Sequence, residues 1–193
     1  MRILCYGDSD TYGHNPCSPL GEPYPPEVRW TDRLAAATGW EIMNAGLNGR
    51  EIPHRPGELA EAERLFAASR PLDLATVFLG SNDMFQGLSA QEVTDRMDAF
   101  LDHLTGYPIL LLSPVPMVSG TWVTEQRLVT ESAKLAGLYE ELARRRGLWF
   151  ADPGTWNIEM AFDGAHYSEE GHRVFARRIQ AVLSKILQSS QNS

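Results

Sequence analysis

The stretch LATVFLG, residues 74–80, is an almost continuous apolar run, and it decides the fold class. A strand with one face in water alternates apolar and polar residues, whereas a strand covered on both faces is apolar throughout. A second run of this kind, PILLLSP, follows at residues 108–114. Two such strands predict a parallel sheet with helices on both of its faces.

The rest of the chain alternates short apolar runs with longer helical patterns, which is typical of an α/β fold. We expect strands at residues 2–7, 41–46, 74–80, 108–114 and 148–152. We expect helices near residues 28–38, 57–69 and 124–146, one that begins at the capping box of Ser89 and Glu92, and a last one from about Ser168.

Length and charge narrow the possible partners. A chain of 193 residues is expected to form one domain, residues 1–188, followed by a frayed polar tail at 189–193. With 17 Lys and Arg against 25 Asp and Glu, the net charge of -8 argues against a nucleic acid or an anionic membrane as the main partner. Neither a membrane-spanning run nor a signal-peptide pattern is evident, so we expect a cytoplasmic protein.

Polar residues suited to acyl transfer follow the expected strand ends. Ser9 lies in YGDSDTYG, Gly46 in NAGLNG, Asn82 in LGSND, and Asp163 and His166 in DGAH. Because ligands bind beyond the carboxyl ends of parallel strands, these residues are expected at one rim. A serine nucleophile needs a histidine base and a carboxylate that orients the histidine, here His166 and Asp163. The backbone N–H groups of Ser9 and Gly46 and the amide of Asn82 would be oxyanion donors.

These four blocks, in this order, resemble the SGNH, or GDSL-type, serine hydrolase family, and the wider pattern resembles its arylesterase and acyltransferase branch. The resemblance implies a three-layer α/β/α sandwich around a flavodoxin-like five-stranded parallel sheet. It also implies hydrolysis of small carboxylic esters such as aryl or sugar acetates through an acyl-enzyme, with transfer to an alcohol as a further activity. Neither a cofactor nor a metal is implied. The related branch is often oligomeric, so a homo-oligomer is a further expectation.

Two alternative functions must be weighed against serine hydrolysis for the same region. In a metal-dependent phosphatase of the haloacid-dehalogenase type, Asp8 would be the nucleophile and Asp10 the acid. Its motif D-x-D-x-[TV] is not completed, because Tyr12 stands at the last position. The only lysines, Lys134 and Lys185, fall within helical patterns instead of a phosphate-binding loop. The other rival is a catalytically inactive binding module on the same fold.

Further residues have less specific signals. Asp10, where the family usually has leucine, and Trp122 are expected to contact substrate. Asp8 is expected to brace the nucleophile loop and Asp83 to cap a turn. Of the remaining histidines, His14 and His54 are expected to be solvated in loops near the crevice, with a contact to substrate as the alternative, and His103 and His172 are expected to be structural in helices.

Overall fold

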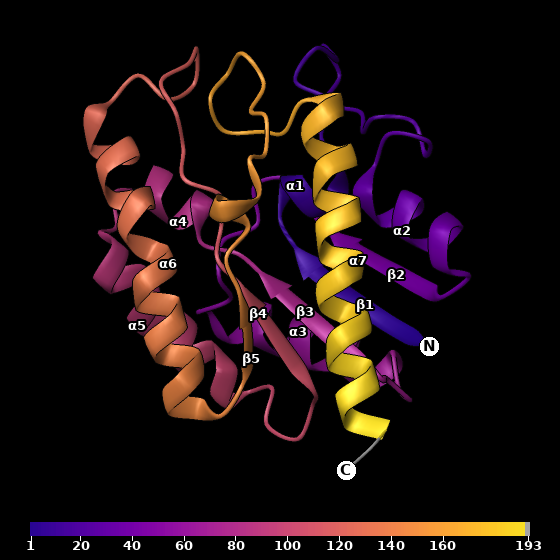
Figure 1. The fold of residues 1–193 in the computed structure, drawn as a ribbon. Helices are drawn as coiled ribbons and strands as arrows, with labels where there is room; N and C mark the ends of the chain where they lie inside the picture. Colours follow the sequence, from indigo (N-terminus) through magenta and orange to yellow (C-terminus); the bar gives the residue numbers. More distant parts are fainter. Residues whose placement is uncertain (192–193) are drawn as a thin grey trace.

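A computed structural model describes residues 1–191 and contains one five-stranded sheet whose strand pairs are all parallel (Figure 1). Its strands are β1 (Arg2–Gly7), β2 (Glu41–Gly46), β3 (Leu74–Phe78), β4 (Ile109–Leu112) and β5 (Trp149–Ala151). Their order across the sheet is β2-β1-β3-β4-β5. The predicted α/β fold with a flavodoxin-like parallel sheet is confirmed.

Helices cover both faces of this sheet. Helices α2 (Trp30–Thr38) and α7 (Glu169–Gln191) pack on one face. On the other face lie α3 (Pro56–Ala68), α5 (Ala90–Asp102) and α6 (Gln126–Arg146). In Figure 1 the long α7 crosses in front of the sheet and α3 lies behind it. Within residues 1–191, no helix has an apolar segment long enough to cross a bilayer.

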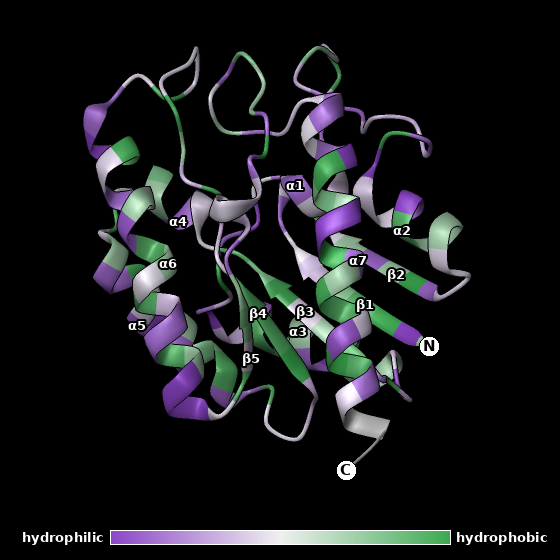
Figure 2. Ribbon diagram, in the orientation of Figure 1, coloured by the Kyte–Doolittle hydropathy of each residue, from purple (hydrophilic) through white to green (hydrophobic). Residues whose placement is uncertain are grey.

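The alternation of side chains along β1 explains why both faces need a helical layer. Ile3 and Cys5 belong to the apolar cluster with α2 and α7, whereas Leu4 and Tyr6 belong to the cluster with α3, α5 and α6. All residues of the central strands β3 and β4 are buried, and the edge strands β2 and β5 are partly exposed. Figure 2 shows the same division, with apolar strands between helices that carry polar residues.

The structure adds elements that the sequence patterns did not predict. Short helices α1 (Ser9–Tyr12) and α4 (Ser81–Phe85) directly follow β1 and β3, and a 3-10 helix, η1 (Pro153–Trp156), follows β5. Strands β3, β4 and β5 are shorter than expected, whereas β1 and β2 have the expected bounds. At the C-terminus, α7 continues to Gln191, so residues 189–191 are helical where a frayed tail was expected. Residues 192 and 193 lie outside the described part.

His172, in the first turn of α7, is an unusual residue for the core. Its side chain is fully buried between the rings of Tyr24 and Tyr167, whose centroids lie 5.4 and 5.6 Å away. Neither ring nitrogen has a hydrogen-bond partner among the described residues. Burial, with the nearby charges of His166 and Arg29, lowers the pKa of His172 to about 3.

We therefore predict that His172 makes the fold acid-sensitive. The unfolded chain binds a proton at this site below a pH of about 6.5, but the folded protein does so only near pH 3. Stability is thus full above pH 6.5 and falls by about 1.4 kcal/mol per pH unit below it. Urea midpoints of His172→Phe and His172→Leu should fall less between pH 7 and 4 than those of the wild type.

Phe175→Leu serves as the control, because this residue of α7, which packs against Tyr167, does not titrate and its substitution should lower stability equally at every pH. Parallel stability curves for the wild type and both His172 variants would contradict the prediction.

Candidate active site

Ser9 is the first residue of α1, immediately beyond the carboxyl end of β1. Asp8 caps this short helix by accepting a hydrogen bond from the backbone N–H of Asp10 at 3.1 Å. Gly13 ends the helix in the left-handed conformation, with φ of 86°. By capping α1, Asp8 braces the nucleophile loop, as the sequence analysis expected. The side chain of Ser9, which is 8% exposed, is therefore presented on a turn held at both ends.

A chain of hydrogen bonds runs from Ser9 to Asp163. Ser9 Oγ lies 3.0 Å from His166 Nε2, and His166 Nδ1 lies 2.6 Å from Asp163 Oδ2. The other carboxylate oxygen of Asp163 accepts the backbone N–H groups of Ala165 and His166, at 2.9 and 3.0 Å. The carboxylate thus holds the imidazole from both its ring and its backbone, with Nε2 facing the serine.

The electrostatic environment of these hydrogen-bonded residues favours a charged Asp163 and a basic His166. Burial opposes the charged carboxylate of Asp163, but its hydrogen bonds from His166 and Ala165 outweigh burial and lower its pKa to about 2. Burial likewise opposes a charged His166. The hydrogen bond to Asp163 and the negative charges of Asp10, Asp163 and Asp8 overcome it and raise the pKa of His166 above its ordinary value.

The segment that carries Asp163 is bonded to the loop after β4. Trp122 and Val123 donate backbone hydrogen bonds to the Asp163 carbonyl at 3.1 and 3.2 Å, and Val118 donates to Gly164 at 3.0 Å. Gly164 has φ of 82°, and a Cβ at this position would lie 2.0 Å from the Val118 carbonyl oxygen. Only glycine allows this close approach, so the two loops can pack directly against each other.

Aromatic rings flank the imidazole of His166. Its centroid lies 4.4 Å from that of His14 and 5.1 Å from that of Trp122, which meets it edge-on. Trp122 is 56% exposed and stands at the mouth of the site. His14, expected as a solvated loop residue, instead packs against His166. The sequence pattern could not predict this contact, because His14 and His166 lie far apart along the chain.

Asn82, at the start of α4, directs its side-chain amide toward the turn after β2. One N–H of Nδ2 donates to the Arg50 carbonyl at 3.0 Å. Because an amide nitrogen carries two protons, the second can serve another acceptor. The backbone N–H of Ser9 is likewise not used by any residue of the described chain in a hydrogen bond.

The expectation for Gly46 needs correction. Its backbone N–H already donates to Asn44 Oδ1 at 2.9 Å, so it is not free for an oxyanion. Its lack of a side chain has another cause, since a Cβ would lie 2.0 Å from the backbone nitrogen of Tyr12. Gly49, an exposed residue in the same turn and one residue before Arg50, has a backbone N–H with no partner in residues 1–191. Gly49 is therefore the better donor candidate.

The sequence motifs did not identify Arg50 as a functional residue. Its guanidinium donates to the carbonyls of Gly7, at 2.8 Å, and of Ala45, and lies 4.3 Å from the centroid of the Tyr6 ring. It thereby ties together the carboxyl ends of β1 and β2 and the turn that faces Asn82. A lone arginine after a glycine carries no sequence signal for this role.

The structure also places the other residues that the sequence analysis singled out. Asp83 does more than cap a turn, because its fully buried carboxylate accepts the backbone N–H of Ile52 at 3.0 Å and pairs with Arg96 at 2.7 Å. His54 contacts the Ile52 carbonyl, and His103 contacts Glu63. Asp10, which directly follows Ser9 in α1, is 6% exposed. Within residues 1–191, no three His, Cys, Asp or Glu side chains are arranged as metal ligands.

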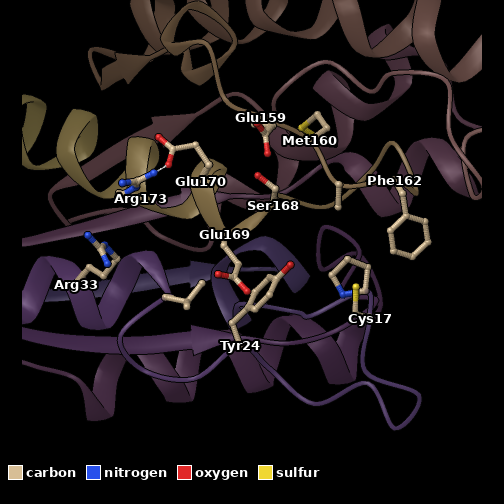
Figure 3. Close-up of a pocket in the computed structure, with 13 residues that line it drawn as sticks. Cys17, Tyr24, Arg33, Glu159, Met160, Phe162, Ser168, Glu169, Glu170 and Arg173 are labelled. Carbon is tan, nitrogen blue, oxygen red and sulfur yellow. Dashed lines mark ion pairs between the residues drawn. The ribbon is translucent and has the colours of Figure 1, made fainter.

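A hollow of about 660 Å³ lies beside the Ser9–His166–Asp163 chain and is lined by none of its three residues (Figure 3). Its walls are the loop at residues 16–28, residues 159–162 and the first turn of α7. Tyr24 and Glu169 lie at its centre, and Phe162, next to Asp163 in the chain, stands at one end. The hollow adjoins the segment that carries Asp163 and His166, because its lining residues Phe162 and Ser168 flank that segment in the sequence.

Solved structures of known proteins share the fold of this chain. The aryl esterase of M. smegmatis is 24% identical with a TM-score of 0.85, over 95% of this chain and 98% of that one. Est24, a carbohydrate acetylesterase from Sinorhizobium meliloti, is 26% identical with a TM-score of 0.83, and a candidate arylesterase from Agrobacterium tumefaciens is 28% identical with a TM-score of 0.83. Each of these two matches covers 95% of this chain and 98% of the other.

No curated protein is similar enough in sequence to count as a match. The model of the GDSL-like lipase/acylhydrolase family matches residues 5–174, which include Ser9, Asn82, Asp163 and His166. The chain therefore belongs to the GDSL-like lipase/acylhydrolase family and is a carboxylic ester hydrolase.

Proposed function

We propose that this hydrolase cleaves small carboxylic esters through an acyl-enzyme on Ser9. The observation that carries the proposal is the continuous chain from Ser9 Oγ through His166 to Asp163, with separations of 3.0 and 2.6 Å. This is the arrangement that turns a weakly nucleophilic hydroxyl into a nucleophile at neutral pH. The same geometry gives no advantage to an inactive binding module, because a buried Asp–His pair costs desolvation energy without helping to bind a neutral ligand.

In the acylation step, Ser9 Oγ bonds to the ester carbonyl carbon while its proton passes to His166 Nε2. Asp163 remains ionised and stabilises the imidazolium that forms. The bond between the carbonyl carbon and the alcohol oxygen then breaks, and His166 returns the proton to the leaving alcohol. Water repeats the sequence in the second half-reaction: it gives a proton to His166, attacks the acyl carbon and releases the acid and Ser9.

Negative charge on the carbonyl oxygen during both steps would be met by three donors. They are the backbone N–H of Ser9, the second amide proton of Asn82 and the backbone N–H of Gly49. Donors fixed before the reaction stabilise the transition state without reorganisation. Arg50 supports two of them, because its carbonyl holds Asn82 and its own backbone continues from Gly49.

The substrate class follows from the surroundings of Ser9. The acyl group would lie against the ring of Trp122. The rings of His14 and His166, which contact Trp122, would narrow the space for it. This favours a short acyl group such as acetyl. The alcohol half would extend toward the hollow of about 660 Å³, which has room for an aryl group or a sugar and combines rings with carboxylates. Aryl acetates and acetylated sugars are the substrates that we propose.

We predict that Ser9→Ala and His166→Ala each remove nearly all hydrolysis of p-nitrophenyl acetate, because the two residues act as one unit in acylation. Circular dichroism should show intact folds. Ser184→Ala, on α7 away from the site, is the matched control and should remain active. An organophosphonate should label the wild type at Ser9 alone.

Labelling at a different serine, or substantial turnover by Ser9→Ala, would contradict the acyl-enzyme. Loss of activity in EDTA that magnesium restores would instead support the phosphatase that uses Asp8 and Asp10.

Asn82→Ala is predicted to lower kcat by roughly 10²- to 10³-fold, with a smaller change in KM, because its amide meets the oxyanion mainly in the transition state. Asn48→Ala removes an exposed amide from the neighbouring turn and is the control, with kcat near that of the wild type. Steady-state kinetics on p-nitrophenyl acetate would measure both. A near-normal kcat for Asn82→Ala would show that its amide only holds Arg50.

We also predict that acetate esters react faster than octanoate esters and that Trp122→Ala narrows the difference. Each methylene that stays unburied loses about 0.8 kcal/mol, or about fourfold in kcat/KM. Removing the indole should open space for the longer chain. Trp149→Ala removes another exposed indole, at the opposite end of the sheet on β5, and should leave the ratio unchanged. Faster turnover of octanoate by the wild type would refute the narrow acyl site.

A further inference from the structure

Residues 50–54 lead from the turn that contains Gly49 to helix α3 and have no regular secondary structure. A segment of this kind has no helix or strand ladder that would fix its backbone, so its place depends on individual hydrogen bonds. The place matters, because a donor stabilises an oxyanion only if it lies where the charge develops. Whatever holds residues 50–54 therefore also sets where the Gly49 amide lies.

Helix α4 holds this segment at two points. The side-chain amide of Asn82 donates to the Arg50 carbonyl at 3.0 Å. The next residue of α4, Asp83, accepts the backbone N–H of Ile52 through Oδ2, also at 3.0 Å. One short helix thus carries a proposed oxyanion donor, Asn82, and a second contact to the segment that follows the other donor.

Arg96, on α5, connects Asp83 to the remaining residue of the segment. Its Nη1 donates to Asp83 Oδ1 at 2.7 Å and to Glu51 Oε2 at 3.1 Å. Each oxygen of the fully buried Asp83 carboxylate therefore has a donor. Burial raises the pKa of Asp83, and the hydrogen bonds from Ile52 and Arg96 oppose that rise. Asp83, Arg96 and Glu51 thus form one connected clasp on the segment.

We propose that this clasp positions the backbone N–H of Gly49 relative to the side-chain amide of Asn82, so that both can donate to the same oxyanion. The role rests on the proposed function, in which these two groups are donors. Asp83 is a positioning residue, because it is fully buried and acts through its neighbours. A merely structural role would be different: Asp83 would then only satisfy the amide of Ile52, whose side chain lies in the core.

The consequence should be confined to the transition state. The carbonyl oxygen of a bound ester carries less charge than the oxyanion and gains less from the donors. Donors that are displaced should therefore lower kcat and leave KM almost unchanged. A network that only stabilises the fold would change the urea midpoint and the fraction of active enzyme, but not kcat per active site.

Glu51 offers the mildest test, because its side chain is 24% exposed and can be changed without opening the core. Glu51→Ala removes one partner of Arg96 and should lower kcat on p-nitrophenyl acetate several-fold. Glu51→Gln keeps an oxygen that can accept from Arg96, so it should recover most of the loss. Glu41→Ala removes a carboxylate that pairs with Arg2 at the amino end of β2, and it is the matched control with unchanged kcat.

Asp83→Asn disturbs the clasp more, because an amide has only one oxygen to accept from both Ile52 and Arg96. The kcat of this variant should fall roughly 10- to 100-fold at nearly constant KM. Titration of Ser9 with an organophosphonate would express each kcat per active site. Urea unfolding of every variant would measure stability separately.

The donors can also be tested with 1,1,1-trifluoroacetone, a ketone of the size of an acetyl group. Ser9 Oγ would bond to its carbonyl carbon while the hydroxyl proton passes to His166 Nε2. The π electrons of the carbonyl group then move to its oxygen, which becomes an oxyanion without a leaving group. Because this adduct resembles the transition state, its inhibition constant should rise in Asp83→Asn by about the factor by which kcat/KM falls.

Unchanged kcat per active site and unchanged inhibition in both Glu51→Ala and Asp83→Asn would overturn the proposal, even if the urea midpoint of Asp83→Asn falls. A higher KM with normal kcat would overturn it as well, because the clasp would then act on substrate binding. If Asp83→Asn does not fold, the two Glu51 variants decide alone. Absence of labelling at Ser9 in the wild type would instead overturn the proposed function, and this proposal with it.

Discussion

The hydrogen bond between Ser9 and His166 joins residues 157 positions apart, and the rest of the structure serves to make it possible. It forms only if the end of β1 and the segment before α7 arrive at one rim. Parallel pairing achieves this, because Gly7 aligns with Gly46 on one side and with Phe78 on the other. The order of strands reverses at β1, and at such a point the loops diverge and leave room for a ligand.

Hydrogen bonds hold the loops at this rim to one another and to the strand ends. Arg50 binds carbonyls at two strand ends, and the amide of Asn44 binds Thr11 and Thr31 while its oxygen accepts from Gly46. The Trp122 loop is bonded along its length to the Asp163 segment. Catalytic groups that are fixed in this way need little reorganisation during reaction, which is a large part of how such sites accelerate acyl transfer. The cost is a set of buried polar groups, of which Asp10 and His172 are incompletely bonded.

Much of the fold could be predicted from local patterns. The apolar runs at residues 74–80 and 108–114 became the two fully buried strands, since their composition suits only a position covered on both faces. The capping box at Ser89 and Glu92 began α5 as expected. Boundaries were accurate for β1 and β2 but less so for β3, β4 and β5, which are each shorter than the apolar run that predicted them. No periodicity can develop within the four residues of α1, so the nucleophile turn left no pattern of its own.

The sequence by itself determined which elements form and which polar residues follow them, because strand and helix periodicity and capping are properties of neighbouring residues. Tertiary structure alone decided what each polar group meets. The amide of Gly46 is occupied by Asn44, His14 packs on His166, and the carboxyl of Asp10 is buried with one oxygen unbonded among the described residues. Hydrogen-bond occupancy, burial and pKa all depend on atoms that lie far away along the chain. They are therefore set only when the layers close around the sheet.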